Sequence, residues 1–299
     1  MRILLTGAGG QLGRHLAPRL ASLGEVIGTD RSGGGDFACD LSDRRLVDKM
    51  LGRVRPDLVL NAAAYTAVDR AEDEPVPAAR INGELPGWLG EWCRAQHAAI
   101  VHFSTDYVFS GVLDRPWRED DTTAPGNVYG HSKLAGERAL LASGAQGVII
   151  RTAWLYSHFP GNFLSAILTR AAQGNPLKIV SDQVGSPTWA GTLAEATRRL
   201  IELRERWSPG CQCFHVAGQG QMSWYEFGVA AIEAAVAAGA LDRAVPIAPI
   251  DSAAWPQKAR RPQWSVLDCG RYQDFTGHHL PTVNDDLDHC LQFWKEQIC

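Results

Sequence analysis

The sequence predicts an α/β protein that has a doubly wound parallel sheet and a second, smaller C-terminal α/β domain. An apolar stretch at residues 2–6 runs directly into a glycine-rich loop. Short apolar stretches then alternate with segments of helical periodicity, as in a parallel sheet whose strands are connected by helices. The 299 residues suffice for one large and one smaller domain. We expect residues 1–155 to form mainly the large domain and residues 156–299 mainly the smaller one, with segments interleaving between them.

Composition and charge exclude several classes of protein. The chain is 45% hydrophobic and 21% charged, and its net charge of −4 is ordinary for a soluble globular protein. No basic field indicates nucleic acid as a partner. No apolar run has the length of a membrane span, and residues 1–7 are typical of a strand entering a glycine loop rather than of a signal peptide. We therefore expect a cytoplasmic protein with no nucleic-acid or membrane partner.

The cysteines do not form a disulfide pattern. They are odd in number and scattered along the chain, at Cys39, Cys93, Cys211, Cys213, Cys269, Cys290 and Cys299. Cys211 and Cys213 are the only close pair, and neither a second pair nor a histidine cluster accompanies them. We expect reduced thiols, with a metal site disfavoured and a redox role unsupported.

The first strand and the loop after it predict a dinucleotide site. The glycines of the loop permit a tight turn, close approach of the backbone to a pyrophosphate, and close packing of the next helix, whose N-terminus favours phosphate. Leucines then repeat at helical spacing, and Gly24 is suited to end this helix. Pro18 lies inside the helix and is expected to kink or destabilise it. The residues expected to contact the dinucleotide are Gly7, Gly10, Gln11, Leu12 and Gly13.

The second strand bears on the choice of cofactor. Residues 25–29 lead to Asp30, whose carboxylate can accept hydrogen bonds from an adenosine ribose, as in NAD sites. Arg31 follows, and its guanidinium could instead pair with the 2′-phosphate of NADP. NADH and NADPH therefore both stay open.

Two further strands border the same site. A short third strand is expected at 39–41, where Asp40 and Leu41 could border the adenine, and Ser42 is expected to cap the next helix. Residues 57–64 are typical of a buried parallel strand. The small residues at its end, which would let a cofactor lie against the backbone, are Ala62, Ala63 and Ala64.

Later strands bring further side chains to the same edge of the sheet. A helical segment at 76–97 leads into an apolar strand at 98–105, which ends in Thr105. Ligands of open α/β sheets bind beyond the carboxyl ends of the strands, so this hydroxyl is expected in the cleft. The strand at 147–152 precedes Trp154, which could stack on a sugar or nucleotide and could equally be a core residue.

Tyr129 and Lys133 form the main candidate for catalysis. If the segment after Asn127 is helical, the two side chains lie one turn apart on the same face. An ammonium group beside a phenol favours the phenolate and lowers the phenol pKa, while Thr105 could polarise a carbonyl. Taken alone, the motif could equally be a Tyr and a Lys packed on a helix flank. The long loop at 110–127 is expected to close over a ligand.

Several blocks of sequence together resemble a known family. The glycine loop and the Tyr129–Lys133 pair are similar to those of the extended short-chain dehydrogenase/reductase superfamily. The resemblance narrows to the dTDP-4-dehydrorhamnose reductase family in the blocks 61–69, 104–109, 127–130, 151–156, 182–188 and 261–262. It covers nearly the whole chain and implies a Rossmann domain, a sugar-nucleotide domain, and reduction of the C4 ketone of dTDP-4-dehydro-L-rhamnose by NADH or NADPH.

The resemblance also implies roles for individual residues. Tyr129 would donate a proton to the C4 oxygen, Lys133 would bind the nicotinamide ribose and tune Tyr129, and Thr105 would orient the ketone. The residues that would line the sugar-nucleotide pocket are Val68, Thr105, Asp106, Tyr107, Trp154, Gln183 and Arg261. Arg261 suits a diphosphate on chemical grounds as well, although it could also be an exposed, solvated arginine.

Other activities of the superfamily stay as alternatives. Related dehydratases follow Thr-Asp with a glutamate base, where this chain has Tyr107, so dehydration lacks its base. Another sugar-nucleotide 4-ketoreductase, or an epimerase with the same Tyr and Lys, is harder to dismiss. A non-catalytic NADP-binding regulatory subunit is disfavoured by the retained Thr105, Tyr129 and Lys133.

One departure from the family concerns a metal ion. Some members dimerise through Mg²⁺ held by glutamates, and His15 and Gly191 stand at those places here, which are poor ligands for a hard cation. We therefore expect no such metal, and either a monomer or a homodimer.

Overall fold

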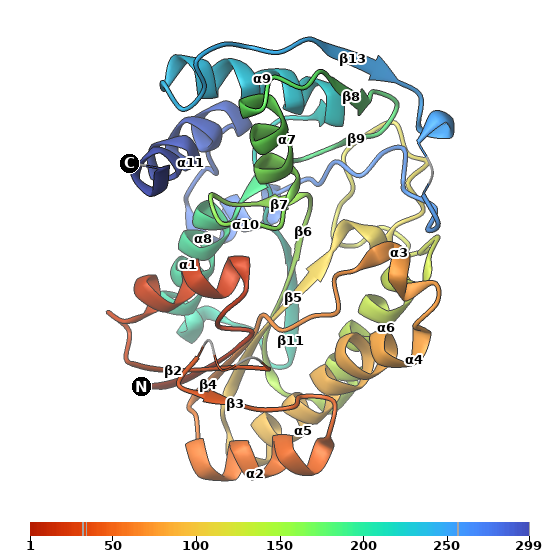
Figure 1. Ribbon diagram of the computed structural model, residues 1–299. Coiled ribbons are helices and arrows are strands. Elements are labelled where there is room, and N and C mark those ends of the chain that lie inside the picture. The colour runs from red at the N-terminus through yellow and green to blue at the C-terminus, as the bar shows by residue number, and fades with distance from the viewer. Residues whose placement is uncertain (32, 34, 256, 299) are drawn as a thin grey trace.

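Seven parallel strands form the central sheet of the computed structural model, which describes residues 1–31, 33, 35–255 and 257–298, with the side chains of 295–298 left out (Figure 1). Their order is β3-β2-β1-β4-β5-β6-β11. The strands are β1 (Arg2–Thr6), β2 (Glu25–Asp30), β3 (Phe37–Ala38), β4 (Leu58–Asn61), β5 (Ala99–Thr105), β6 (Gln146–Thr152) and β11 (Cys211–His215). Because the order reverses between β1 and β4, their carboxyl ends define a crevice suited to a ligand.

Helices cover both faces of this sheet, as predicted from the alternation of strands and helices. Along β1, Ile3 and Leu5 belong to the core under α1 (Gln11–Leu20), α8 (Ala190–Glu202) and α10 (Gly270–Thr276). Leu4 points to the opposite core, under α2 (Arg44–Val54), α5 (Leu85–Gln96) and α6 (Val128–Ser143). Strand side chains alternate between faces, so apolar residues in succession require cover on both sides. The doubly wound α/β fold is therefore confirmed.

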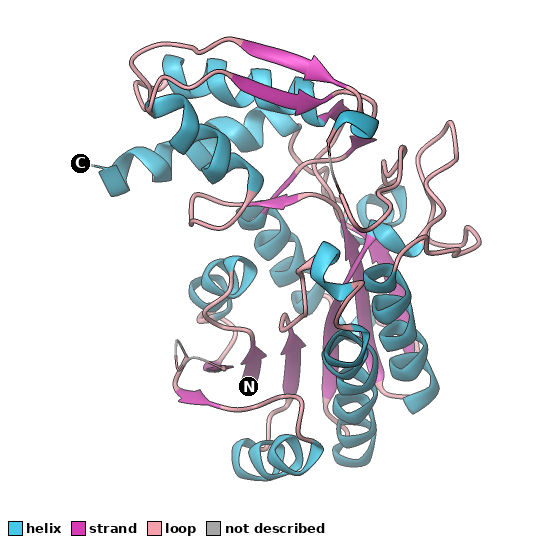
Figure 2. Ribbon diagram, turned by 45° about the vertical axis from the view of Figure 1, so that its right-hand side comes forward, coloured by secondary structure: helices cyan, strands magenta, loops and turns pink. Residues whose placement is uncertain are grey.

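A second hydrophobic core lies beyond the carboxyl ends of the sheet strands (Figure 2). It is built on α7 (Phe163–Ala172), α9 (Trp224–Ala237) and α11 (Val283–Ile298). Three two-stranded sheets accompany these helices, and they pair β7 (Leu155–Tyr156) with β10 (Thr188–Trp189), β9 (Val184–Gly185) with β12 (Met222–Ser223), and β8 (Leu177–Val180) with β13 (Ile247–Ile250). The carboxyl edge of the large sheet therefore faces the second core (Figure 2).

Short helices connect β4 to β5. They are α3 (Val68–Ala71) and α4 (Pro75–Ala78), and a π-helical turn at Ala79–Glu84 joins α4 to α5. The helical segment expected at 76–97 is confirmed. Pro86 lies in the first turn of α5, where its missing N–H costs little, so it does not interrupt the segment.

The end of the first helix differs from the expectation. α1 continues past Pro18 but ends at Leu20, before the predicted cap. Gly24 instead lies where the chain passes the backbone of Met1 too closely for any side chain. The glycine is thus required by packing of the chain against its own N-terminal strand.

The third strand and the cap of the second helix are shifted by a few residues. β3 is formed by 37–38 rather than by 39–41. α2 is capped by Asp43, whose carboxylate accepts from the Arg45 N–H, rather than by Ser42. The Ser42 hydroxyl instead donates to Asp40 at 2.7 Å. Ser and Asp are both good N-caps, and the sequence alone does not choose between adjacent ones.

The described residues show free cysteines and no membrane span. Six of the seven cysteines are free thiols, and Cys299 lies outside the described residues. Burial raises the pKa of Cys211 to about 11 and that of Cys213 to about 12, so both stay protonated at neutral pH. Among the helices that the structure describes, none has the length and apolar character needed to cross a bilayer.

Candidate active site

The glycine loop lies at the crevice between β1 and β4. Gly7 has a φ of 69°, and a Cβ there would lie 2.8 Å from the Ala63 nitrogen. Gly13 faces the Gly7 carbonyl so closely that no side chain fits between α1 and the loop. Gly10 is the N-cap of α1, and no described side chain caps that end of the helix. Backbone N–H groups at the helix N-terminus can therefore serve a phosphate, and the loop fits a dinucleotide.

The other predicted residues of the loop are held by the protein itself. The Gln11 side chain donates to the Gly161 carbonyl at 3.3 Å and accepts from Ser157 and Asn162, so it ties the loop to the segment before α7. The Leu12 side chain is packed in the core. Leu12 can therefore contact a ligand only through its backbone.

The candidate adenosine contacts lie at the ends of the next strands. Asp30 ends β2 and is partly buried, whereas Arg31 beside it is exposed. Asp40 accepts hydrogen bonds from the Ser42 side chain and backbone, and these bonds lower the pKa of its carboxyl group. Leu41 is buried in a core, so only its backbone can face the adenine. This arrangement keeps Asp40 ionised at neutral pH.

The small residues after β4 lie directly beside the loop. Ala62, Ala63 and Ala64 are all partly buried. The Ala63 N–H donates to the Thr6 hydroxyl at 3.2 Å, which fixes this stretch against β1. The backbone at the crevice is therefore held in place by the sheet itself.

Helix α6 brings Tyr129 to the end of β5, where Thr105 lies. Asn127 is the N-cap of α6 and accepts from the Gly130 N–H at 2.8 Å. Because Gly130 has no side chain, α6 can approach the Tyr107 carbonyl closely. The Tyr129 ring meets the Tyr107 ring edge-on at 5.7 Å between centroids. Tyr129 is thus held at the carboxyl end of β5 by the helix cap and an aromatic neighbour.

The expected pKa of Tyr129 is wrong for this structure. The pKa of Tyr129 is raised to about 12, mainly by burial and also by the Asp106 carboxylate, while the hydrogen bond with Thr105 opposes both. We expect Lys133 to lower the pKa of the phenol, but the shift is upward, because burial disfavours the charged phenolate. Tyr129 therefore keeps its proton at neutral pH and can act as an acid.

Lys133 is 2% exposed, and its ammonium group donates to the Phe103 carbonyl at 2.5 Å. Burial lowers its pKa to about 8, which Glu137 opposes. Glu137 itself forms a buried ion pair with Arg151, at 2.7 Å. Lys133 is therefore positioned by the backbone of β5 and stays largely charged at neutral pH.

Thr105 and Asp106 form a hydrogen-bonded pair at the end of β5. The Thr105 hydroxyl donates to Asp106 Oδ1 at 2.9 Å and accepts from the Tyr107 N–H at 3.2 Å. Burial raises the pKa of Asp106 to about 7, although the bond from Thr105 opposes this. Burial likewise raises the pKa of Tyr107. The pair places a hydroxyl and a partly protonated carboxyl beside Tyr129.

Trp154 follows β6 and has a left-handed backbone, with a φ of 46°. Its ring stacks on Trp224 from α9, at 3.6 Å between centroids and 2° between planes. Gly185 lies against the same ring, where a Cβ would come within 2.5 Å. The face toward Trp224 is therefore not available to a sugar.

Gln183 and Arg261 line a cavity of about 320 Å³ together with Ser110, Gly111, Val112, Ser252, Ala253, Trp255, Gln257, Ala259, Arg260, Pro262 and Gln263. Gln183 is buried, at 5% exposure. Arg261 pairs with Asp69 at 3.0 Å, and Val68 precedes Asp69 at the start of α3. Arg261 is therefore not the isolated, solvated arginine of the alternative interpretation.

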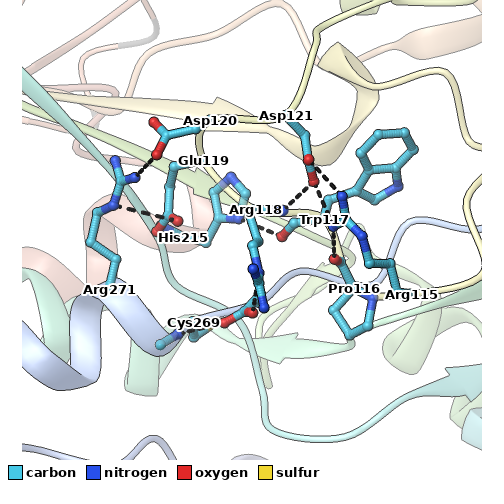
Figure 3. Close-up of polar contacts among 12 residues, drawn as sticks. Arg115, Pro116, Trp117, Arg118, Glu119, Asp120, Asp121, His215, Cys269 and Arg271 are labelled. Carbon is cyan, nitrogen blue, oxygen red and sulfur yellow. Dashed lines mark hydrogen bonds and ion pairs between the residues drawn. The ribbon is translucent and has the colours of Figure 1, made fainter.

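The long loop before α6 is anchored rather than free (Figure 3). His215 Nδ1 donates to the Trp117 carbonyl at 3.0 Å, and the His215 backbone N–H donates to Glu119 at 2.9 Å. Arg271 from α10 also pairs with Glu119, at 3.6 Å. Residues 110–112, which border the cavity, lie before this anchored part. Closure over a ligand stays a prediction, and these contacts restrict it to the start of the loop.

His15 and Gly191 are the two residues that we expect to be poor ligands for Mg²⁺. The His15 ring packs edge-on against His158 at 5.0 Å and Trp189 at 5.7 Å. Gly191 also lies against the Trp189 ring. Within the residues described, no group of three or more His, Cys, Asp or Glu side chains is arranged to hold a metal ion. The absence of a metal in the working protein stays a prediction.

Three residues of the site carry no role in the sequence prediction. Asn127 holds the Arg260 carbonyl at 2.8 Å as well as capping α6. Asp69 holds Arg261, and Trp224 holds Trp154. An Asn before a helix is a recognisable cap, but the partners of Asp69 and Trp224 are remote in sequence and give no local signal.

The sheet order, the glycine loop at its crevice and the Tyr–Lys helix define the class of protein: a dinucleotide-dependent α/β protein of the short-chain dehydrogenase/reductase type. A family model described as "RmlD substrate binding domain" matches residues 1–295. The chain belongs to this family, that of the dTDP-4-dehydrorhamnose reductases.

Known proteins are similar over the whole length. The dTDP-4-dehydrorhamnose reductase of Burkholderia thailandensis is 39% identical over 298 residues, which are 98% of each chain. The crystal structure of the Clostridium acetobutylicum reductase has a TM-score of 0.88 at 33% identity and covers 99% of this chain and 100% of its own. That of the Bacillus anthracis reductase, in complex with NADP, has a TM-score of 0.88 at 27% identity and covers 98% of this chain and 99% of its own.

Proposed function

We propose that the chain reduces the C4 ketone of dTDP-4-dehydro-L-rhamnose to dTDP-L-rhamnose, with NADH or NADPH as the reductant. The observation that carries the proposal is the meeting of Thr105, Asp106 and a protonated Tyr129 at the carboxyl end of β5, on the same edge of the sheet as the glycine loop. A ketone reductase needs an acid for the oxygen and a site for a hydride donor at one place. Full-length similarity to reductases of that substrate supports the choice of sugar.

The cofactor would lie across the carboxyl edge of β1, β2 and β4. The glycine loop and the N-terminus of α1 suit the pyrophosphate, since no described side chain caps that helix. When bound, a reduced nicotinamide supplies the hydride. The residues that would hold the cofactor are Gly7, Gly10, Gln11, Leu12, Gly13, Asp30, Arg31, Asp40, Leu41, Ala62, Ala63, Ala64, Tyr129 and Lys133.

Tyr129 would supply the proton. With a pKa near 12 it is protonated at neutral pH and gives up its proton only as negative charge develops on the C4 oxygen. Thr105 would hold that oxygen, since its hydroxyl is fixed by Asp106 and the Tyr107 N–H. The positive charge of Lys133 would then stabilise the phenolate that remains and bind the nicotinamide ribose.

The substrate would extend from Tyr129 into the cavity beside Arg261. Residues 1–155 would mainly bind the cofactor and residues 156–299 mainly the sugar nucleotide, interleaved because β11 joins the large sheet. The residues that would line its path are Val68, Thr105, Asp106, Tyr107, Trp154, Gln183 and Arg261. We propose a cytoplasmic enzyme that acts as a monomer or homodimer.

The test is a turnover assay with purified protein. dTDP-4-dehydro-L-rhamnose is mixed with NADH or NADPH, cofactor oxidation is followed at 340 nm, and the sugar formed is identified by NMR. One cofactor oxidised per dTDP-L-rhamnose formed is expected. A changed sugar without net oxidation would indicate an epimerase, whereas NADPH binding without turnover would indicate a regulatory subunit.

A further inference from the structure

The segment that carries Arg261 to the cavity is fixed by one carboxylate from the other side of the site. Asp69 Oδ1 accepts from the backbone N–H groups of Lys258, at 3.1 Å, and Ala259, at 3.0 Å. Its Oδ2 accepts from Arg261 Nη2, at 3.0 Å. Ala259 is buried, and the Arg261 side chain is 15% exposed. One side chain on α3 therefore sets both the backbone and the guanidinium of a segment 189–192 residues away.

The same region of the chain also fixes the start of α6. Glu72, which follows α3, accepts from the Val128 N–H at 2.9 Å. Asn127, the cap of α6, donates to the carbonyl of Arg260 at 2.8 Å. Asp69, Glu72 and Asn127 thus link the Arg261 segment to the helix that carries Tyr129. The distance between the proton donor and the guanidinium is set by these bonds.

The chemistry of Arg261 permits it to serve Asp69 and a ligand together. A guanidinium has five N–H donors in a planar fork; one terminal nitrogen of Arg261 donates to Asp69, and the other makes a long bond to the Ala259 carbonyl, at 3.5 Å. The other donors can meet phosphate oxygens, since such forks suit phosphate geometry. Without Asp69, the long Arg261 side chain would be ordered only when the ligand binds. The rotamer freedom lost at that moment would weaken ligand binding.

We propose that Asp69 is a positioning residue for the sugar nucleotide: it presents the Arg261 guanidinium to the diphosphate at a fixed span from Tyr129. This inference rests on the proposed function, because it takes the ligand to be a nucleoside diphosphate sugar. Asp69 touches neither the reacting carbon nor the cofactor and acts through Arg261.

The Asp69→Asn variant tests this inference. An asparagine keeps an oxygen for the two backbone N–H groups but turns a donor toward Arg261, so it removes the guanidinium contact and little else. We expect the KM for the sugar nucleotide to rise about tenfold, with kcat within about twofold and the NADPH Kd unchanged. The matched control is Asp73→Asn, which breaks an exposed ion pair with Lys258 of the same segment. Exposed pairs contribute little, so this control should behave as wild type.

A double-mutant cycle with Arg261→Ala separates positioning from a general structural role. If Asp69 acts through Arg261, then Asp69→Asn adds nothing to the KM once Arg261 is alanine. Additive effects on KM, a weakened NADPH Kd or an unchanged KM in Asp69→Asn would each overturn the inference. Failure of the proposed function shows separately, because wild-type protein would then not turn over the dTDP-sugar at all.

Discussion

Replacing Tyr129 by phenylalanine removes one oxygen from the site and leaves its surroundings in place. The edge-on contact with Tyr107 needs only the ring. Thr105 keeps its bonds to Asp106 and to the Tyr107 N–H. Little change in folding stability or NADPH affinity is therefore expected. Loss of the acid should lower kcat by about 10²–10⁴, which is about 2.7–5.4 kcal/mol of transition-state stabilisation.

The assay is steady-state oxidation of NADPH with dTDP-4-dehydro-L-rhamnose, alongside NADPH titration by fluorescence and thermal unfolding. Tyr107→Phe serves as the comparison, because it removes a neighbouring hydroxyl that we propose to face the substrate, and it should therefore act on KM more than on kcat. Turnover of Tyr129→Phe within a few-fold of wild type would remove Tyr129 from the reaction. A large loss in NADPH affinity would show that the hydroxyl binds the cofactor rather than transferring a proton.

Three further outcomes follow from buried charges. The kcat should fall as pH rises through about 8, because Lys133 then loses its proton, and a profile that stays flat to pH 10 would contradict its role. Glu137→Gln leaves the Arg151 guanidinium buried without its ion pair. It should lower the free energy of unfolding, measured by urea titration, by about 3–5 kcal/mol. An unchanged free energy of unfolding would show that the pair does not stabilise the fold. Burial raises the pKa of Asp286 to about 7, whereas the unfolded carboxyl titrates near its ordinary value. The folded state therefore holds a proton that the unfolded state has lost between about pH 4 and pH 7, so wild-type stability decreases as pH rises through that window and Asp286→Asn should remove this decrease. Parallel stability curves for the two proteins would refute that assignment.

The fold could be predicted because each of its signals is local. Residues 2–6 show their strand by an apolar run, and the glycines after them show the loop by their spacing. The ends of the helices are predicted less well. α1 ends at Leu20, before Gly24, and Asp43 rather than Ser42 caps α2. Adjacent residues with similar propensities compete there, and tertiary contacts decide between them.

The pKa of Tyr129 could not be predicted in the same way. The Tyr129–Lys133 spacing correctly indicated that both side chains lie one turn apart on α6. It said nothing of how much water surrounds the phenol, nor of the Asp106 carboxylate that follows β5. The sign of a pKa shift depends on the balance between desolvation and charge, and both are properties of the folded site. The upward shift keeps Tyr129 protonated, which agrees with the proton-donor role that the resemblance implies.

The contacts that unite the site are long-range, which is why sequence patterns miss them. Asp69 and Arg261 both stand in blocks that resemble the reductase family, yet nothing in either block indicates that they pair. The bond forms only because β4 and the helix after it bring Asp69 to the carboxyl edge of the sheet, where the chain returns between α9 and α11 of the second core. A residue of α3 thereby positions the guanidinium of Arg261, 192 residues further along the chain. Substrate affinity should therefore be more sensitive to Asp69 than its distance from the reacting carbon would suggest.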